Sequence, residues 1–183
     1  MNSPWLVVID MQVVFGDPTS AWYTPGYPAI EPMVARLVEH FGKRVVLTRF
    51  IAPEHPTGAW VSYYELWPFA LVHHSDPLYD LMPAFAGTDH PQISRTTFGK
   101  WGDELSTIIG PDAAVVLAGV STDCCVLSTA LAAADAGVRV IVAQDACAGL
   151  SAADHQRALD AMALYGPLIE IVTADWVLRP MRA

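Results

Sequence analysis

The sequence lacks both a basic segment and a long apolar segment. Ten Lys and Arg residues stand against 19 Asp and Glu residues, so the formal net charge is −9. Without basic patches, non-specific binding to nucleic acid or to an anionic membrane is disfavoured. The apolar run near the N-terminus, WLVVI (5–9), follows no cationic residue and is too short for a signal peptide or a membrane span. We therefore expect no nucleic-acid partner and no membrane association.

Cysteine is also scarce. The chain has three cysteines, and two of them, Cys124 and Cys125, are adjacent. This number and spacing make a poor disulfide framework, which favours a reducing compartment. We therefore expect a cytoplasmic protein.

What the sequence has in abundance is hydrophobic residues, which make up 53% of its 183 positions, whereas charged residues make up 16%. A chain of this length can bury a sizeable core without metal or disulfide support. We therefore expect a single domain over residues 1–183. Apolar surface left over from such a core favours a homodimer or a higher homo-oligomer.

Five short β-branched runs predict strands, at residues 5–10, 44–49, 113–119, 138–144 and 168–173. They are continuously apolar rather than alternating, which is typical of strands covered on both faces of a parallel sheet. Helical patterns lie between them, at 30–41, 123–136 and 151–165. Alternating strands and helices predict a three-layer α/β/α fold with a doubly wound, mainly parallel sheet. Ligands bind such sheets at the carboxyl ends of the strands.

The region from about 50 to 100 does not follow this alternation. It holds six of the 14 prolines, three of the six tyrosines and two of the six tryptophans, and it includes the stretch GAWVSYYELWPFALVHH. No clear linker separates it from the rest, so we interpret it as an irregular, aromatic-rich insertion in the same domain. A lid or a dimer surface beside the ligand cleft would both fit this composition.

Two segments place reactive side chains at strand ends. Asp10 closes the first predicted strand, where it either serves a ligand site or caps the next loop. GVSTDCC (119–125) follows the strand at 113–119, so its cysteines fall in the first turn of a helix. Backbone N–H groups and the helix dipole at that position lower a thiol pKa and can stabilise an oxyanion. Alternatively, Cys124 and Cys125 are unreactive and pack as small buried hydrophobic residues.

The ordered combination of DMQxxF (10–15), GVSTDCCV (119–126) and DAC (145–147) resembles the isochorismatase-like cysteine hydrolase superfamily, which includes nicotinamidases and carbamoylsarcosine amidases. The resemblance extends from about Trp5 to Thr173. It implies the Rossmann-like three-layer fold of that family, and it implies a hydrolase.

The resemblance also implies roles for individual residues. Cys125 matches the family nucleophile, and Cys124 falls on a variable position that we expect to turn away from the pocket. Asp10 matches the general acid and base. The backbone N–H groups of Ser121 and Cys125 match the oxyanion hole, with a cis peptide bond before Ser121.

The third catalytic residue of the family is a lysine, and here the sequence departs from the pattern. In ISRTTFGKW (93–101), Arg95 falls on the lysine position, with Phe98 and Trp101 on the aromatic positions. Arginine keeps the charge but is not a geometric equivalent of lysine. We expect Arg95 in the catalytic set and interpret Lys100 as a solvated surface lysine, unless the loop folds it back.

Metal ligands of the nicotinamidase branch are absent from the expected positions, where the sequence has Phe50 and Ala52. Among the remaining histidines, His73 and His74 are adjacent and show no ligand spacing. We therefore expect no metal and no cofactor, and nicotinamide becomes a poor candidate substrate.

Candidate substrate-binding residues are one polar side chain beside Asp10 and several aromatic side chains that would wall a pocket for a planar or apolar substrate. The group between Trp60 and Trp67 fits an interface equally well. The candidates are Gln12, Phe15, Trp60, Tyr64, Trp67 and Phe98.

Three functions follow as hypotheses. The first is cleavage of a C–N bond in a small amide or carbamoyl compound through a thioester on Cys125. The second is hydrolysis of an isochorismate-like vinyl ether, with Asp10 as the acid and Cys125 incidental. The third is a catalytically silent member that binds a small molecule or partner chain, an alternative motivated by Arg95.

Overall fold

The computed structural model describes residues 2–111 and 113–179. Its centre is one six-stranded, all-parallel sheet in the order β3-β2-β1-β4-β5-β6. The strands are β1 (Asn2–Ile9), β2 (Val45–Phe50), β3 (Gln92–Arg95), β4 (Ala113–Val120), β5 (Val140–Ala148) and β6 (Ile169–Val172). The predicted doubly wound α/β/α class is confirmed.

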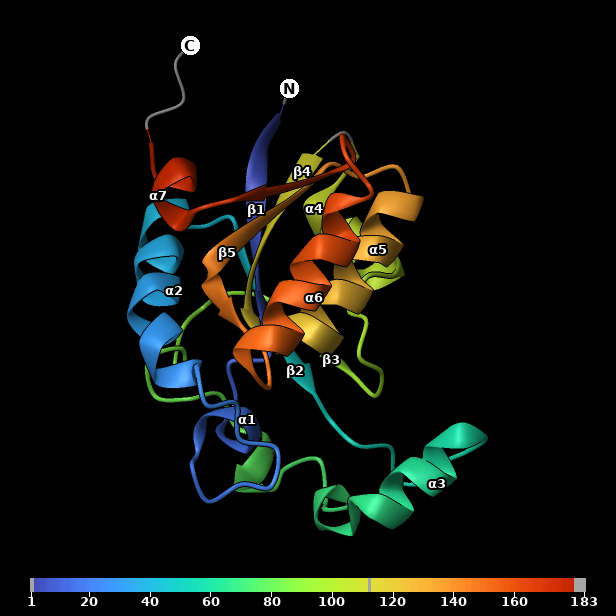
Figure 1. The fold of residues 1–183 in the computed structure, drawn as a ribbon. Coiled ribbons are helices and arrows are strands. Elements are labelled where there is room, and N and C mark those ends of the chain that lie inside the picture. The colour runs from blue at the N-terminus through green and yellow to red at the C-terminus, as the bar shows by residue number, and fades with distance from the viewer. Residues whose placement is uncertain (1, 112, 180–183) are drawn as a thin grey trace.

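Helices cover both faces of the sheet (Figure 1). One face carries α2 (Tyr27–Phe41) and α7 (Ala174–Val177), and the other carries α4 (Asp103–Ile109), α5 (Leu127–Asp135) and α6 (Ala152–Ala163). Side chains of β1 alternate between the two cores. Leu6 and Val8 pack on the α2 side, whereas Val7 and Ile9 pack on the α5 and α6 side.

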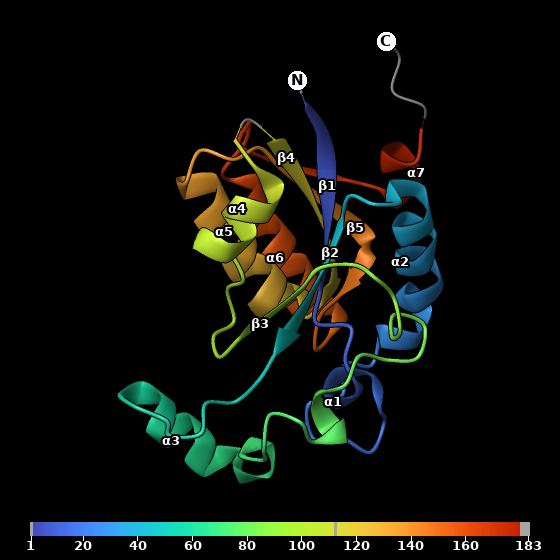
Figure 2. The same cartoon turned by 180° about the vertical axis from the view of Figure 1, so that it is seen from behind.

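The short elements lie beyond the carboxyl ends of the strands. They are α1 (Val13–Gly16), α3 (Ala59–Leu66), the 3-10 turns η1 (Pro68–Ala70) and η2 (Pro77–Tyr79), and the π-helical turn η3 (Thr122–Val126). Seen from either side, α3 projects away from the sheet (Figures 1 and 2). None of the helices within the described residues is long and apolar enough to span a bilayer.

Five of the six strands fall close to the predicted runs, but β3 does not follow from the apolar pattern. It is a four-residue edge strand inside the aromatic-rich region, and only Ile93 among its residues is buried. The predicted helix at 123–136 is present as η3 followed by α5. α4 is a further element for which the sequence pattern gave no prediction.

Candidate active site

The strand order places the candidate site at a topological switch point. β1 lies between β2 and β4, and the direction of winding reverses there, so the connections after β1 and β4 leave toward opposite faces. Such a point opens a crevice at the carboxyl edge of the sheet. Asp10 follows β1, and Cys125 lies in η3 directly after β4. The topology therefore brings together two residues that are far apart in the sequence.

The backbone at this crevice is tightly packed. Gly119 has φ +120°, and a Cβ atom added there would lie 2.1 Å from the carbonyl oxygen of Ile9. Only glycine fits that close approach between β4 and β1. Asp10 itself has φ 49°, a left-handed conformation that aspartate tolerates better than most residues.

Asp10 is fully buried and held by hydrogen bonds from β2. The Thr48 hydroxyl donates to Asp10 Oδ1 over 2.7 Å and accepts from the Asp10 backbone N–H over 3.2 Å. Thr48 is also fully buried. One carboxylate oxygen is thus fixed by the neighbouring strand, and the other is left to face the site.

Lys100 supplies the charge that balances this carboxylate. Its Nζ lies 2.9 Å from Asp10 Oδ2, and both side chains are completely buried. The ammonium also donates to the Thr97 carbonyl and lies 5.2 Å from the centre of the Phe50 ring. The interpretation of Lys100 as a solvated surface lysine is therefore wrong.

The loop that carries Lys100 is tied to the helix that carries Cys125. The Lys100 backbone N–H donates to the Thr129 hydroxyl, which in turn donates to the Cys125 carbonyl over 2.6 Å. These contacts fold the chain after β3 back over the sheet edge. The spacing of the residues in the sequence did not predict that this loop folds back. The lysine count was a usable signal, because the chain has only one other lysine, Lys43, which is exposed.

Arg95 lies outside this arrangement. It is the last residue of β3, and its Nη1 pairs with Glu104 Oε2 of α4 over 3.2 Å, with both side chains partly exposed. The prediction that Arg95 occupies the catalytic position is contradicted by this geometry. An edge-strand side chain directed at a surface carboxylate cannot also replace the buried ammonium beside Asp10.

The thiol of Cys125 lies in the same buried environment. Burial raises the pKa of Cys125 well above its usual value, the Asp10 charge raises it further, and the Lys100 charge lowers it. The expected lowering of this thiol pKa by the helix N-terminus is therefore wrong in direction. Together, the Cys125 thiol, the Asp10 carboxylate and the Lys100 ammonium carry no net charge. The net charge stays zero when the thiol proton passes to the carboxylate, so a thiolate can form in this site.

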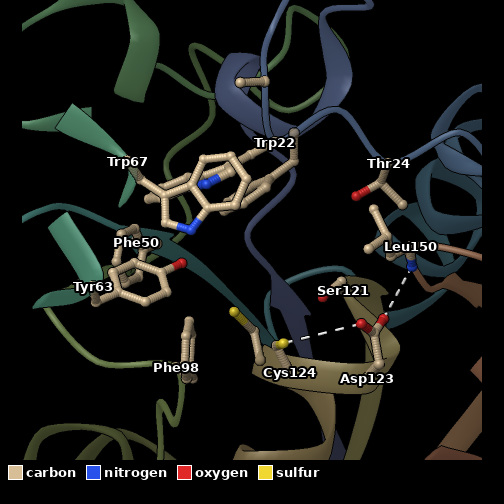
Figure 3. A pocket seen from close by; sticks show the side chains of 13 residues that line it. Trp22, Thr24, Phe50, Tyr63, Trp67, Phe98, Ser121, Asp123, Cys124 and Leu150 are labelled. Carbon is tan, nitrogen blue, oxygen red and sulfur yellow. Dashed lines mark hydrogen bonds between the residues drawn. The ribbon is translucent and has the colours of Figure 1, made fainter. Parts of the chain in front are cut away.

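We expected Cys124 to turn away from the cavity. It lines the cavity together with Cys125, so this expectation is wrong. Figure 3 shows the Cys124 sulfur directed toward the Asp123 carboxylate, at 4.0 Å from Oδ2. Neighbouring side chains in a helical turn diverge less than on a strand, where they point to opposite faces. The two thiols meet different neighbours and also differ in burial, since Cys125 is buried beside Asp10 and Lys100 and Cys124 is half-buried beside Asp123.

Ser121 begins this segment and lines the cavity beside the two thiols (Figure 3). The Val120–Ser121 peptide bond is cis. The Ser121 carbonyl accepts hydrogen bonds from the backbone N–H groups of Cys124 and Val126, the second of which closes the π-helical turn. The strand-to-helix connection is thus hydrogen-bonded from its first residue.

Two further residues of GVSTDCC brace the turn against α6. Thr122 is fully buried, and its hydroxyl is 2.9 Å from His155 Nδ1. Asp123 accepts a hydrogen bond from the Leu150 N–H over 3.0 Å, as Figure 3 shows. Both contacts connect η3 to the start of α6 and so hold the cysteines in place.

A cavity of about 240 Å³ opens beside Cys125. Aromatic side chains form most of its wall, with Trp22 at their centre (Figure 3). The Trp22 ring stacks on Phe15 and meets Phe50, Trp67 and Tyr63 at steeper angles. Its lining residues are Phe15, Ala21, Trp22, Thr24, Phe50, Tyr63, Trp67, Phe98, Ser121, Asp123, Cys124, Cys125 and Leu150.

Three of the predicted substrate-binding aromatics, Phe15, Trp67 and Phe98, line this cavity. Trp60 and Tyr64 do not; they pack against each other and form a layer behind it. In α3, it is Tyr63, one residue before Tyr64, that faces the site. The missed residues Trp22 and Phe50 lie outside the predicted Trp60–Trp67 group, and no spacing in the sequence connected them to it.

Gln12 does not line the cavity either. Its side-chain N–H groups donate to the Phe50 and Tyr79 carbonyls, and its Oε1 accepts from the Phe50 N–H over 2.7 Å. Full burial leaves it no access to a substrate. Gln12 therefore positions the end of β2 against η2, and its predicted substrate contact is contradicted.

The positions at which the resemblance implies metal ligands hold buried, apolar Phe50 and Ala52. The interpretation that His73 and His74, being adjacent, show no ligand arrangement is nevertheless wrong for this chain. The His73 and His74 ring centres are 4.0 Å apart, and with Glu54 they form a cluster outside the cavity lining.

Comparisons with known proteins agree with this architecture. The structure is similar to a cysteine hydrolase from Pseudomonas syringae pv. phaseolicola 1448A, with a TM-score of 0.84 and 23% identity over 98% of this chain and 93% of that one. It is also similar to the pyrazinamidase of Pyrococcus horikoshii in complex with zinc, with a TM-score of 0.77 and 28% identity over 94% of this chain and 99% of that one. These similarities define the fold of the protein as the one that both of these enzymes have.

The isochorismatase domain model matches residues 4–174. The chain therefore belongs to the isochorismatase family. Among curated proteins it is 28% identical, over 153 residues, to isochorismatase domain-containing protein 2 of Xenopus laevis. That match covers 83% of this chain and 65% of the Xenopus protein, so the chain spans less than two thirds of the length of this relative.

Proposed function

We propose that the protein is a cysteine hydrolase that cleaves a carbon–nitrogen bond of a small amide or carbamoyl compound. The observation that carries this proposal is the buried Cys125 thiol beside the Asp10–Lys100 ion pair, at the edge of an aromatic cavity. A nucleophile, a proton acceptor and a balancing cation then occupy one site.

In the first half-reaction, Asp10 takes the thiol proton and the Cys125 thiolate attacks the carbonyl carbon of the substrate. The negative charge moves from sulfur to the carbonyl oxygen, where the backbone N–H groups of Ser121 and Cys125 are the proposed donors. Asp10 returns its proton to the nitrogen as the C–N bond breaks. The products of this step are a free amine or ammonia and a thioester on Cys125.

In the second half-reaction, Asp10 removes a proton from water, and the resulting hydroxide attacks the thioester carbon. The C–S bond breaks, the acid leaves, and the thiol regains its proton. Lys100 keeps its charge throughout and offsets the negative charge that moves between Asp10, the sulfur and the substrate oxygen. This assigns to Lys100 the role that the sequence pattern gave to Arg95.

The cavity favours a small uncharged substrate with an apolar or ring-bearing group. Its volume lies below the range of about 300–1,000 Å³ typical of drug-sized ligands. No Lys or Arg of the described residues lines it, and its one carboxylate, Asp123, is already engaged by Leu150 and Cys124. An isochorismate-like vinyl ether carries carboxylates that would meet no cation here, so this second hypothesis receives no support.

The silent-member hypothesis depended on the lack of a lysine at the site. Lys100 beside Asp10 removes that argument, because the ammonium comes from a different position in the same loop. An active enzyme is therefore the function that the geometry supports best.

An ammonia-release screen over small amides and carbamoyl compounds tests the proposal. We expect release by the wild type, beginning with uncharged ring-bearing amides. Cys125→Ser should lower the rate by about three orders of magnitude or more, since it removes the nucleophile. Cys124→Ser is the matched control and should remain within a few-fold of the wild type, as should Arg95→Met.

Intact-protein mass spectrometry during turnover provides a second readout. We expect a transient mass increase equal to the acyl group, mapped to Cys125. Full activity of Cys125→Ser, or an acyl group mapped to Cys124, would exclude the proposed mechanism.

A further inference from the structure

A cluster of three potential metal ligands lies outside the candidate active site. Glu54, His73 and His74 each offer one ligand atom, and these atoms lie within 4.8 Å of one another. No other group of this kind occurs in the part of the chain that the structure describes. We propose that these three residues bind a zinc-type divalent cation. Two imidazole nitrogens and one carboxylate oxygen are a ligand set that zinc uses, with water completing the shell.

A turn brings the two adjacent histidines to the same side of the chain. The Asp76 backbone N–H donates to the His73 carbonyl over 2.8 Å, which closes the turn that His73 opens. His73 Nδ1 is 2.8 Å from the Ser75 hydroxyl and also accepts a hydrogen bond from the Ser75 backbone N–H over 3.3 Å. Metal binding at His73 Nε2 therefore requires the ring to give up the bond from the backbone N–H and to carry its proton on Nδ1. That N–H would then donate to the Ser75 hydroxyl, as the second nitrogen of a metal-binding histidine usually does.

Glu54 reaches this turn because another residue already joins the two chain segments. The Tyr79 hydroxyl accepts a hydrogen bond from the Ala52 N–H over 3.2 Å and donates to the Ala70 carbonyl. This contact holds the segment that leaves β2 beside the segment that follows η1. The cluster is therefore built on a fixed base, although its three side chains are exposed and accessible to an ion from solvent.

The segment between the ligands, residues 55–72, is here called the arm. It contains α3, which projects from the sheet in Figures 1 and 2, and it carries Tyr63 and Trp67, which line the cavity. An ion shared by Glu54 and the two histidines would join both ends of the arm and lower its freedom to move. The bound ion would thus stabilise the part of the cavity wall that the arm carries, and it would not act on the Cys125 thiol.

Isothermal titration with zinc chloride tests the site on metal-free full-length protein. Because thiols also bind zinc, the titration is carried out in the Cys124→Ser/Cys125→Ser background. We expect one zinc per chain, and a loss of affinity in His74→Ala and Glu54→Gln of at least about tenfold, the lower value typical for the loss of an outer-shell partner. His55→Ala, an exposed histidine outside the cluster, is the matched control and should bind as the parent does. Magnesium should not bind, because it prefers oxygen ligands.

Hydrogen exchange of the arm distinguishes a specific site from adventitious binding. Zinc should slow amide exchange within residues 55–72 in the parent protein and leave it unchanged in Glu54→Gln. The proposal is overturned if the parent binds no zinc, if His55→Ala weakens binding as much as His74→Ala, or if exchange in the arm does not respond. None of these outcomes depends on catalytic activity, so they do not bear on the proposed hydrolase reaction.

Discussion

Replacing Lys100 by methionine removes one partner of a completely buried ion pair and leaves the Asp10 carboxylate without its cation. At a separation of 2.9 Å the direct attraction is about 6 kcal/mol with an effective dielectric constant of ~20. The lost cost of desolvating the ammonium offsets part of this, and deletion of one partner of a buried pair costs about 3–5 kcal/mol in practice. We therefore expect Lys100→Met to lower the free energy of unfolding by about 3–5 kcal/mol.

Equilibrium unfolding in urea measures this change against two control variants, one of a lysine and one of an arginine. Lys43→Met alters an exposed lysine and should change the unfolding free energy by less than about 0.5 kcal/mol. Arg95→Met breaks the partly exposed pair with Glu104, which is screened by solvent and worth at most about 1 kcal/mol. The three variants together decide which basic side chain is buried against Asp10.

A variant that fails to fold is still informative through a double substitution. Asp10→Asn/Lys100→Met removes both charges, so it should be more stable than Lys100→Met alone, because no unpaired charge remains buried. Equal unfolding midpoints for Lys100→Met and Lys43→Met would refute the buried pair. A double variant less stable than Lys100→Met would refute the electrostatic explanation.

Three further predictions concern the scaffold of the site. Gly119→Ala should lower the free energy of unfolding in urea by about 4 kcal/mol or more, because its Cβ would overlap Ile9. Gly137→Ala is the control and should cost about 1–2 kcal/mol, because Gly137 has φ +82° but lies in open space. Equal costs would contradict the close packing of β4 on β1. Gln12→Ala should cost about 3 kcal/mol, because it strands buried backbone groups of Phe50 and Tyr79, and a value below about 1 kcal/mol would show that these groups find other partners. Burial lowers the pKa of His155 from 6.5, and the Asp123 charge opposes this shift. The unfolded chain therefore binds more protons than the folded chain below about pH 6.5, so stability falls as the pH falls through that range. Thermal unfolding at several pH values should show this loss in the wild type and a smaller loss in His155→Gln.

The class of fold was predictable because its strands are buried on both faces. Continuous apolar runs mark such strands without any tertiary information, and helical patterns between them require a parallel sheet. β3 escaped this reasoning because it is a short edge strand with one buried residue, so it carries no apolar run. The aromatic-rich region likewise has no periodic pattern that separates rings facing the cavity, such as Tyr63, from rings behind it, such as Tyr64.

The candidate site divides in the same way. Asp10 and Cys125 follow directly from predicted strands, and a strand end determines where such residues lie in a doubly wound sheet. Gln12 also follows a strand, yet its hydrogen bonds go to the backbone of β2 and η2, which only the folded chain brings near. Proximity in sequence to a candidate catalytic residue was therefore insufficient evidence of a substrate contact.

By itself the sequence determined that apolar strands alternate with helices and that a thiol and a carboxylate stand at strand ends, because local patterns encode burial and chain direction. Only the tertiary structure decided that Lys100, rather than Arg95, pairs with Asp10, because that pairing depends on how an irregular loop folds back onto α5. It likewise decided that Cys124 and Cys125 both line one cavity but meet different groups, with Cys125 buried beside Asp10 and Lys100 and Cys124 half-buried beside Asp123. Local spacing specifies the elements, whereas the contacts between loops depend on the packing of the whole chain.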